Sequence, residues 1–196
     1  MASILPNRAV VGAVLLLLVS APAHAVPLMH LSVGGAGPDG NVRTGDSVTL
    51  SILASGIPAG SDGLGLFGFG FDIGFDATGL AASNLTLGPL WQLTGFDDSL
   101  DLPGLVGLTS NRFFQTSGPF GDDILLGTID FQGLAPGPYD LTLGFFTGVG
   151  DNVLFDGTMI DADPGFFGTG SITVPEPVSS VLFLIGLLAL SSSRRR

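Results

Sequence analysis

The chain contains no cysteine and no lysine, and its only glutamate is Glu176. In an exported protein, the absence of cysteine excludes disulfide bonds, thiol nucleophiles and cysteine-based metal sites. A folded domain must therefore be held together by its apolar core, aided at most by bound cations.

Familiar catalytic motifs are also absent. The sequence has no G-x-S-x-G nucleophile elbow, no P-loop and no dinucleotide-binding fingerprint. The sequence contains two histidines, His24 and His30. His24 lies in an N-terminal segment that we expect to be cleaved off, as described below, so no His pair would remain for a catalytic zinc site. His30 lies in an apolar strand, where we expect it to be packed or surface-exposed rather than catalytic. We predict a non-enzymatic protein. A secreted carbohydrate-active hydrolase, with two aspartates flanking a cleft, is the rival interpretation.

Negative charge dominates the central part of the chain. Residues 26–173 contain 16 aspartates and two arginines, Arg43 and Arg112, which gives a formal charge of −14. Such a surface repels nucleic acid and anionic membranes and attracts divalent cations or basic partners. We therefore expect no nucleic-acid partner.

The first 25 residues are organised as a secretory signal peptide. Arg8 supplies the positive charge, residues 9–19 are apolar, and Ala23-His24-Ala25 fits the small-x-small rule for cleavage. Cleavage after Ala25 leaves Val26 as the new N-terminus. An uncleaved N-terminal anchor is the alternative.

The C-terminal residues 174–196 form a second processing segment. Val174-Pro175-Glu176-Pro177 precedes an apolar run at 178–190, three serines and Arg194-Arg195-Arg196. A spanning helix usually needs about 20 residues. A membrane helix at about 178–193 is therefore marginal in length, and the terminal arginines should keep this end in the cytoplasm. A buried helix of the exported domain is the alternative.

This order of Val-Pro-Glu-Pro, apolar run and arginine cluster resembles the PEP-CTERM sorting signal, a bacterial C-terminal tag processed by exosortase. The same tag is also catalogued as an ice-binding-protein C-terminal motif. The resemblance implies that exosortase and the secretion machinery are partners, that membrane anchoring is transient, and that the protein then reaches the cell surface or the extracellular matrix. The expected organisation is a signal peptide at 1–25, an exported domain at 26–173 and a sorting signal at 174–196. The sorting residues are Val174, Pro175, Glu176, Pro177, Arg194, Arg195 and Arg196.

The exported domain is predicted to be all-β. In the clearest strand, 66–75, large apolar residues from Phe67 to Phe75 alternate with Gly68, Gly70, Asp72 and Gly74. The small residues indicate that another sheet or loop packs closely there, with a smooth binding face as the alternative. About eight or nine short strands separated by Gly, Pro and Asp turns predict an antiparallel β-sandwich of jelly-roll or immunoglobulin type. The other expected strands are 28–33, 48–54, 84–87, 91–94, 112–116, 124–132, 139–147, 153–155 and 168–174, and 34–41 is expected to be a turn.

Two of these segments resemble strands of cohesin-type modules. Strand 66–75 ends in Phe75-Asp76-Ala77-Thr78-Gly79-Leu80, and Leu125-Leu126-Gly127-Thr128-Ile129-Asp130-Phe131 follows downstream. They are similar to the F-D-P-x-x-L and L-x-x-I-x-F strands of cohesins, although Ala77-Thr78 stands where proline is common. The resemblance implies a jelly-roll sandwich that binds other proteins.

No cofactor is required by the sequence, but loop carboxylates suggest calcium. The densest oxygen-rich set is Asp151-Asn152, Asp156, Asp161 and Asp163, and its four aspartates are the candidate ligands, because Ca²⁺ takes six to eight oxygen ligands. The alternative is that these aspartates are solvated turn residues.

We expect a structural or adhesive role at the surface or in a polysaccharide matrix. A carbohydrate- or protein-binding module is the alternative, with exopolysaccharide or another protein as partner. Aromatic loop residues such as Trp91, the only tryptophan, and Phe96 would then contact the sugar, although for Trp91 we favour a core position.

Overall fold

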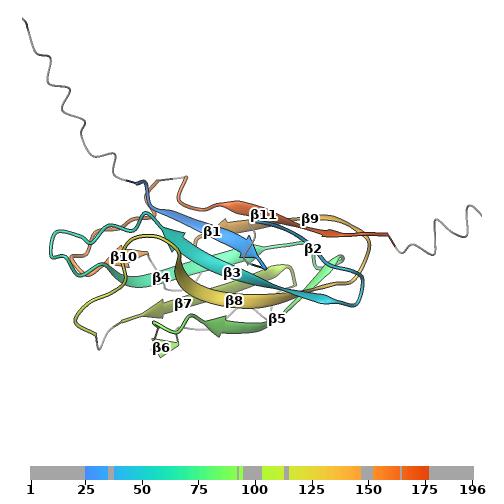
Figure 1. The fold of residues 1–196 in the computed structure, drawn as a ribbon, viewed down its shortest axis with the longest axis horizontal. Helices are drawn as coiled ribbons and strands as arrows, with labels where there is room; N and C mark the ends of the chain where they lie inside the picture. The colour runs from blue at the N-terminus through green and yellow to red at the C-terminus, as the bar shows by residue number, and fades with distance from the viewer. Residues whose placement is uncertain are drawn as a thin grey trace, which may run out of the picture.

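The computed structural model describes residues 25–34, 38–91, 93–94, 103–112, 115–146, 152–163 and 165–176. These residues form two packed β-sheets (Figure 1). The all-β prediction is confirmed for this part of the chain. The expected helices at the two chain ends lie outside the described residues. Within the described ranges, we find no helix with the length and apolar character needed to cross a bilayer.

The smaller sheet has four strands in the spatial order β1, β3, β8, β5, and all of its pairs are antiparallel. Its side chains alternate between the core and the outer face, as the period of two in a strand requires. The strands are β1 (Leu28–Val33), β3 (Ser47–Ser55), β8 (Ile124–Gly133) and β5 (Leu80–Leu87).

The larger sheet runs in the order β2, β11, β9, β4, β7, β6, and β10 also pairs with β4. The β2–β11 pair is parallel and the others are antiparallel. The strands are β2 (Asp39–Asn41), β11 (Thr169–Val174), β9 (Gly137–Gly144), β4 (Leu66–Gly74), β7 (Leu105–Asn111), β6 (Leu93–Thr94) and β10 (Val153–Leu154).

Aromatic side chains fill the space between the sheets. Phe69, Phe71 and Phe131 are fully buried, and burial of one such side chain contributes about 1.5–3 kcal/mol. Trp91 is 5% exposed, packs edge-on against Phe69 at 4.6 Å between ring centroids, and donates its indole N–H to the carbonyl of Leu125 at 3.0 Å. The core position of Trp91 is therefore confirmed, and stacking on a sugar is excluded for a side chain so buried.

The first strand joins the two sheets along one side. β1 belongs to the smaller sheet, yet Met29 donates its N–H to Phe166 and accepts from Gly168, just before β11. The chain then forms β2, which runs parallel to β11. Because the first and last strands run in the same direction, the described chain enters at one end of the sandwich and leaves at the opposite end (Figure 1).

Residues 112, 115 and 116 of the expected strand 112–116 are not in a strand, and residues 113–114 lie outside the described ranges. The strand in this region is β7, which ends at Asn111, and Gln115 instead donates to Arg112 in a turn. β7 was missed because Gly107, Thr109, Ser110 and Asn111 dilute its apolar pattern. The expected turn 34–41 also contains β2, whose Asp-Gly-Asn sequence is typical of turns and is extended only by pairing with β11.

The small-residue side of β4 is closed. Gly68 and Gly70 are buried, and Asp72 is only 6% exposed. Asn152 lies beside Gly70, to whose carbonyl it donates at 2.9 Å. The close-packing interpretation of these glycines is confirmed, and the smooth binding face proposed as its alternative is not available at Gly68 and Gly70.

Candidate functional site

The outer face of the smaller sheet carries a row of short polar side chains. Thr49 donates to one oxygen of Asp130 at 2.6 Å, and Asn84 donates to the other at 2.9 Å. The bond from Thr49, and then that from Asn84, lowers the pKa of Asp130 below its ordinary value. Thr86 and Thr128 share a hydrogen bond beside this pair. The face therefore presents a fixed, ionised carboxylate among hydroxyl groups.

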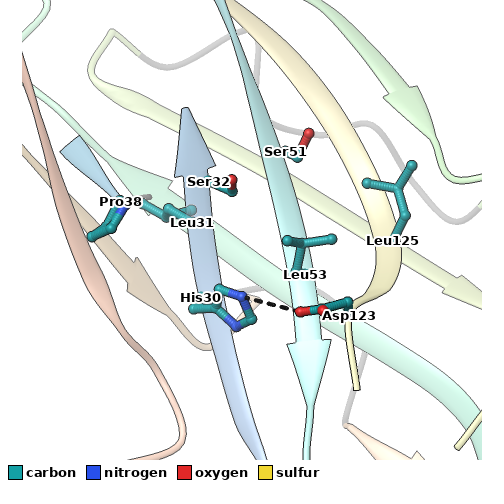
Figure 2. A pocket seen from close by; sticks show the side chains of 8 residues that line it. All are labelled: His30, Leu31, Ser32, Pro38, Ser51, Leu53, Asp123 and Leu125. Atoms are coloured by element: carbon teal, nitrogen blue, oxygen red, sulfur yellow. Dashed lines mark ion pairs between the residues drawn. The ribbon is translucent and has the colours of Figure 1, made fainter. Parts of the chain in front are cut away.

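A shallow depression of about 440 Å³ lies on this face, near its β1 edge. Figure 2 shows His30 on β1 pointing across β3 toward Asp123, which precedes β8. His30 Nε2 lies 4.0 Å from Asp123 Oδ1, and the side chains are 29% and 79% exposed, respectively. The depression is lined by His30, Leu31, Ser32, Pro38, Ser51, Leu53, Asp123 and Leu125.

The local backbone explains why Asp123 faces outward. Asp123 adopts φ 55°, a left-handed conformation that aspartate and asparagine tolerate better than most residues. Its N–H donates to the Ser55 hydroxyl at 3.0 Å, which ties it to the end of β3. The carboxylate therefore stands at the rim of the depression.

The depression lacks the arrangement needed for nucleophilic catalysis. His30 Nδ1 is buried and has no hydrogen-bond partner among the described residues. His30 Nε2 faces a carboxylate, so neither ring nitrogen takes a proton from Ser32 or Ser51. A Ser-His-Asp triad requires the serine hydroxyl to be hydrogen-bonded to the imidazole. What the depression offers instead is an apolar floor, two hydroxyl groups and one anionic rim.

The predicted calcium residues make separate local contacts. Asp156 accepts hydrogen bonds from Ser61, through both its N–H at 2.7 Å and its hydroxyl at 2.8 Å, and from the N–H of Thr158 at 3.0 Å. The Ser61 N–H bond, followed by those of Thr158 and the Ser61 hydroxyl, holds the pKa of Asp156 well below its usual range. Asp163 accepts from the N–H of Gly165 at 2.8 Å.

Asp161 is the buried member of this set. It is 4% exposed and accepts two bonds from Asn152, one from the backbone N–H at 3.1 Å and one from the side-chain amide at 3.0 Å. No group of three or more His, Cys, Asp or Glu side chains gathers into a metal-binding arrangement among the described residues. Asp151 lies outside those residues, so the calcium site stays a prediction.

Asn152 entered the sequence analysis only as a member of the oxygen-rich calcium set, and its structural role was not predicted. β9 pairs with β4 at residues 72–74 and β10 pairs with β4 at residues 66 and 68, which leaves Gly70 between them. The amide of Asn152 fills that gap by bonding to Gly70, and Asp161 holds the amide from the other side. Sequence gives no signal of this role because Gly70 lies 82 residues away from Asn152 along the chain.

The sorting residues lie at the edge of the described structure. Val174 is the last residue of β11, pairs with Gly137 and is 1% exposed. Pro175 and Glu176 follow directly, and Pro177, Arg194, Arg195 and Arg196 lie outside the described residues. Ala23 also lies outside, whereas Ala25 lines a second depression of about 400 Å³ with Pro27, Gly56, Ile57, Pro58, Gly121 and Asp122.

Comparison with known proteins finds the fold among cohesins. No family model and no curated protein matches the chain. The sixth cohesin from scaffoldin B of Acetivibrio cellulolyticus, solved in complex with a Cel5 dockerin, has a TM-score of 0.56 at 17% identity and covers 75% of this chain and 99% of its own.

Two further cohesins are similar. The seventh ScaB type I cohesin from Pseudobacteroides cellulosolvens has a TM-score of 0.53 at 20% identity and covers 76% of this chain and 94% of its own. A non-cellulosomal cohesin from Archaeoglobus fulgidus has a TM-score of 0.53 at 13% identity and covers 78% of this chain and 93% of its own. At these identities the likeness establishes the cohesin-like β-sandwich fold.

Proposed function

We propose that this chain is an exported, non-enzymatic module that binds another protein at the cell envelope. The observation that carries the proposal is the likeness to cohesins over almost their whole length, since one of these neighbours is in complex with a dockerin. Binding by that protein does not transfer with the fold. The likeness supports only the proposed class of function, which is protein binding, and the experiment below identifies the partner.

Two features of the structure favour this proposal over a hydrolase and over a sugar-binding module. Among the described residues, the single histidine faces Asp123 and its buried Nδ1 has no hydrogen-bond partner, which argues against a Ser-His-Asp centre. Trp91, one of the two aromatic residues named for the sugar-binding alternative, lies in the core, and the other, Phe96, lies outside the described residues. A flat open sheet face of small polar residues suits contact with a protein surface.

The cellular location of the module is also part of the proposal. The N-terminal segment 1–25 would direct export, and the PEP-CTERM-like segment 174–196 would hold the protein in the cytoplasmic membrane, with its C-terminus in the cytoplasm, until exosortase acts. The mature protein would then reside at the surface or in an extracellular polysaccharide matrix. The direct continuation of β11 into Pro175 and Glu176 agrees with a signal attached at the end of a folded domain.

Protein binding is tested by reconstitution. The full-length tagged chain is purified from the producer's envelope with its bound proteins, and each candidate is then purified and titrated against the chain alone. A single exported protein that binds saturably at 1:1 stoichiometry supports the proposal. Hydrolysis of the producer's matrix that is lost on Asp122→Asn or Asp123→Asn, without any reconstituted partner, would instead establish the rival enzyme.

Sorting is tested independently of binding. Replacing Pro175, Glu176 and Pro177 together with alanine should leave full-length protein in the membrane fraction, as followed by immunoblotting. Release of that variant at the normal rate would refute the sorting part of the proposal and leave the binding part untouched.

A further inference from the structure

The two outer faces of the sandwich differ in how open they are. On the larger sheet, Thr109 is 5% and Asp72 6% exposed although both point outward, and Phe146 lies over Gly107. On the smaller sheet, Thr49, Asn84 and Thr86 are exposed on the outer surface. The outer face of the smaller sheet is therefore more accessible than that of the central strands β4 and β7 in the larger sheet, whose strands β9 and β11 also carry exposed outward residues.

Charge on this open face has one sign. The four strands of the smaller sheet contain no lysine or arginine. Asp130 lies on the face, and Asp123 stands at the rim of the depression. Residues 26–173 carry a formal charge of −14, so the domain as a whole is also strongly negative.

Both arginines of the exported domain are placed away from the depression. Arg43 lies beside Gly133, at the opposite end of β8 from Asp123. Arg112 follows β7 of the larger sheet, donates to the carbonyls of Ser117 and Leu90, and lies over the Trp91 ring. The carboxylate of Asp123 is therefore not paired with a permanent cation in the described structure.

The shape of the depression suits a long basic side chain. Leu53 and Leu125 provide an apolar floor for the aliphatic stem, because lysine and arginine bury their methylene groups while the charged head remains at the rim. Asp123 can accept that head, and the hydroxyls of Ser32 and Ser51 can accept its remaining N–H donors. The imidazole of His30 limits the depression on the β1 side (Figure 2).

We propose that this depression receives a lysine or arginine side chain from a basic segment of a partner protein, which lies across the outer face of the smaller sheet. This inference rests on the proposed protein-binding function and adds to it the face and the chemistry of the partner. Asp123 is the anchor of the basic head, and Asp130 provides a second fixed charge for the same segment.

The test uses the full-length chain in detergent micelles and a fluorescein-labelled hexa-arginine peptide, followed by fluorescence anisotropy at low salt. Asp123→Asn should weaken binding roughly three- to fivefold, which corresponds to loss of one solvent-accessible ion pair. Ser51→Arg should weaken it more, because a guanidinium group of the chain itself would occupy the depression. Asn also tolerates the left-handed backbone of residue 123.

Two matched controls alter charge on the other sheet. Asp140→Asn and Thr169→Arg make the same charge changes at exposed, outward positions of β9 and β11. Both should leave the affinity within twofold of the original chain. Circular dichroism of each variant checks that the sandwich is intact.

Three results would overturn the inference. Equal weakening by Asp123→Asn and Asp140→Asn would mean that the peptide responds to overall charge. A glucosamine oligomer that binds as tightly as the peptide, with the same dependence on Asp123, would mean that the occupant is a cationic polysaccharide. A reconstituted protein partner that binds the Ser51→Arg variant with unchanged affinity would place the interface elsewhere while the proposed function stands.

Discussion

Gly79 provides a sharp test of how the sandwich is packed. It lies at the turn before β5, directly against the ring of Tyr139, so a Cβ added to Gly79 would overlap Cε1 and Cζ of that ring. Tyr139 is held in place by its hydroxyl, which donates to the carbonyls of Ala135 and Pro136 at 3.0 and 3.2 Å. Gly79→Ala must therefore displace the ring and break these bonds.

The cost follows from these contacts. Overpacking costs about 1–3 kcal/mol, and loss of the hydroxyl bonding adds about 1 kcal/mol. Reduced freedom of the unfolded chain returns about 0.4–1 kcal/mol. We expect a net loss near 2 kcal/mol in the free energy of unfolding. A domain of this size loses about 2–4 °C of Tm per kcal/mol, so Tm should fall by roughly 4–8 °C.

Urea and thermal unfolding, followed by the fluorescence of the buried Trp91, measure this loss. Gly144→Ala is the matched control, because a Cβ there meets nothing within 4 Å. It should leave the stability unchanged or slightly higher. In a Tyr139→Ala background the space is open, so Gly79→Ala should become nearly neutral. Equal losses from Gly79→Ala with and without the Tyr139 ring would refute the reasoning.

Three other outcomes follow from the polar contacts. Asn152→Ala removes the side-chain amide that bonds to both Gly70 and Asp161 and leaves the buried Asp161 only the backbone N–H of residue 152. We therefore expect a loss of about 1–3 kcal/mol and faster amide hydrogen exchange in β4 and β10; unchanged exchange would contradict the bridging role of Asn152. The pKa of Asp130 and of Asp156 is lowered in the folded chain, so their contribution is present above the ordinary pKa of 3.8 and is lost as the pH falls below it. The double variant Asp130→Asn/Asp156→Asn should consequently lose less Tm between pH 5 and pH 2.5 than the original chain, and equal losses would count against this assignment. Because Asp156, Asp161 and Asp163 each accept hydrogen bonds from different protein groups, Tm should be the same in calcium, in magnesium and in chelator at equal ionic strength; a rise of several degrees in calcium alone would establish a site.

How much of the fold was predictable depended on the strength of the local pattern. The strict alternation around Phe69 and Phe71 predicted β4 within one residue, and β1 was predicted with its observed bounds. β7 has only Val106 and Leu108 as large buried side chains, and its extended form depends on pairing with β4. β2 likewise exists through β11, which lies far along the chain. Such strands are determined by tertiary contacts, and no alternation of apolar and polar residues in the local sequence indicates them.

The candidate site was less predictable than the fold. The sequence identified His30 as the single histidine of residues 26–173 but gave no reason to pair it with Asp123, because β3 lies between β1 and β8 in the sheet. The calcium hypothesis grouped aspartates by nearness in sequence. In the structure, Asp156 instead turns toward Ser61, which is remote in the chain. Proximity in sequence is a poor guide where loops from different strands meet.

The parallel arrangement of the first and last strands determines how the domain would respond to mechanical force. A pull between residues 25 and 176 acts along β1, β2 and β11 from opposite ends of the sandwich (Figure 1). The six residue pairs between β11 and β9, and the six between β1 and β3, are then loaded together in shear. If the force instead pulled two paired strands apart from one end, these pairs would open one after another, as in the peeling of a hairpin. A module tethered through the residues after Val174 can therefore sustain tension applied at its far end with its core in place.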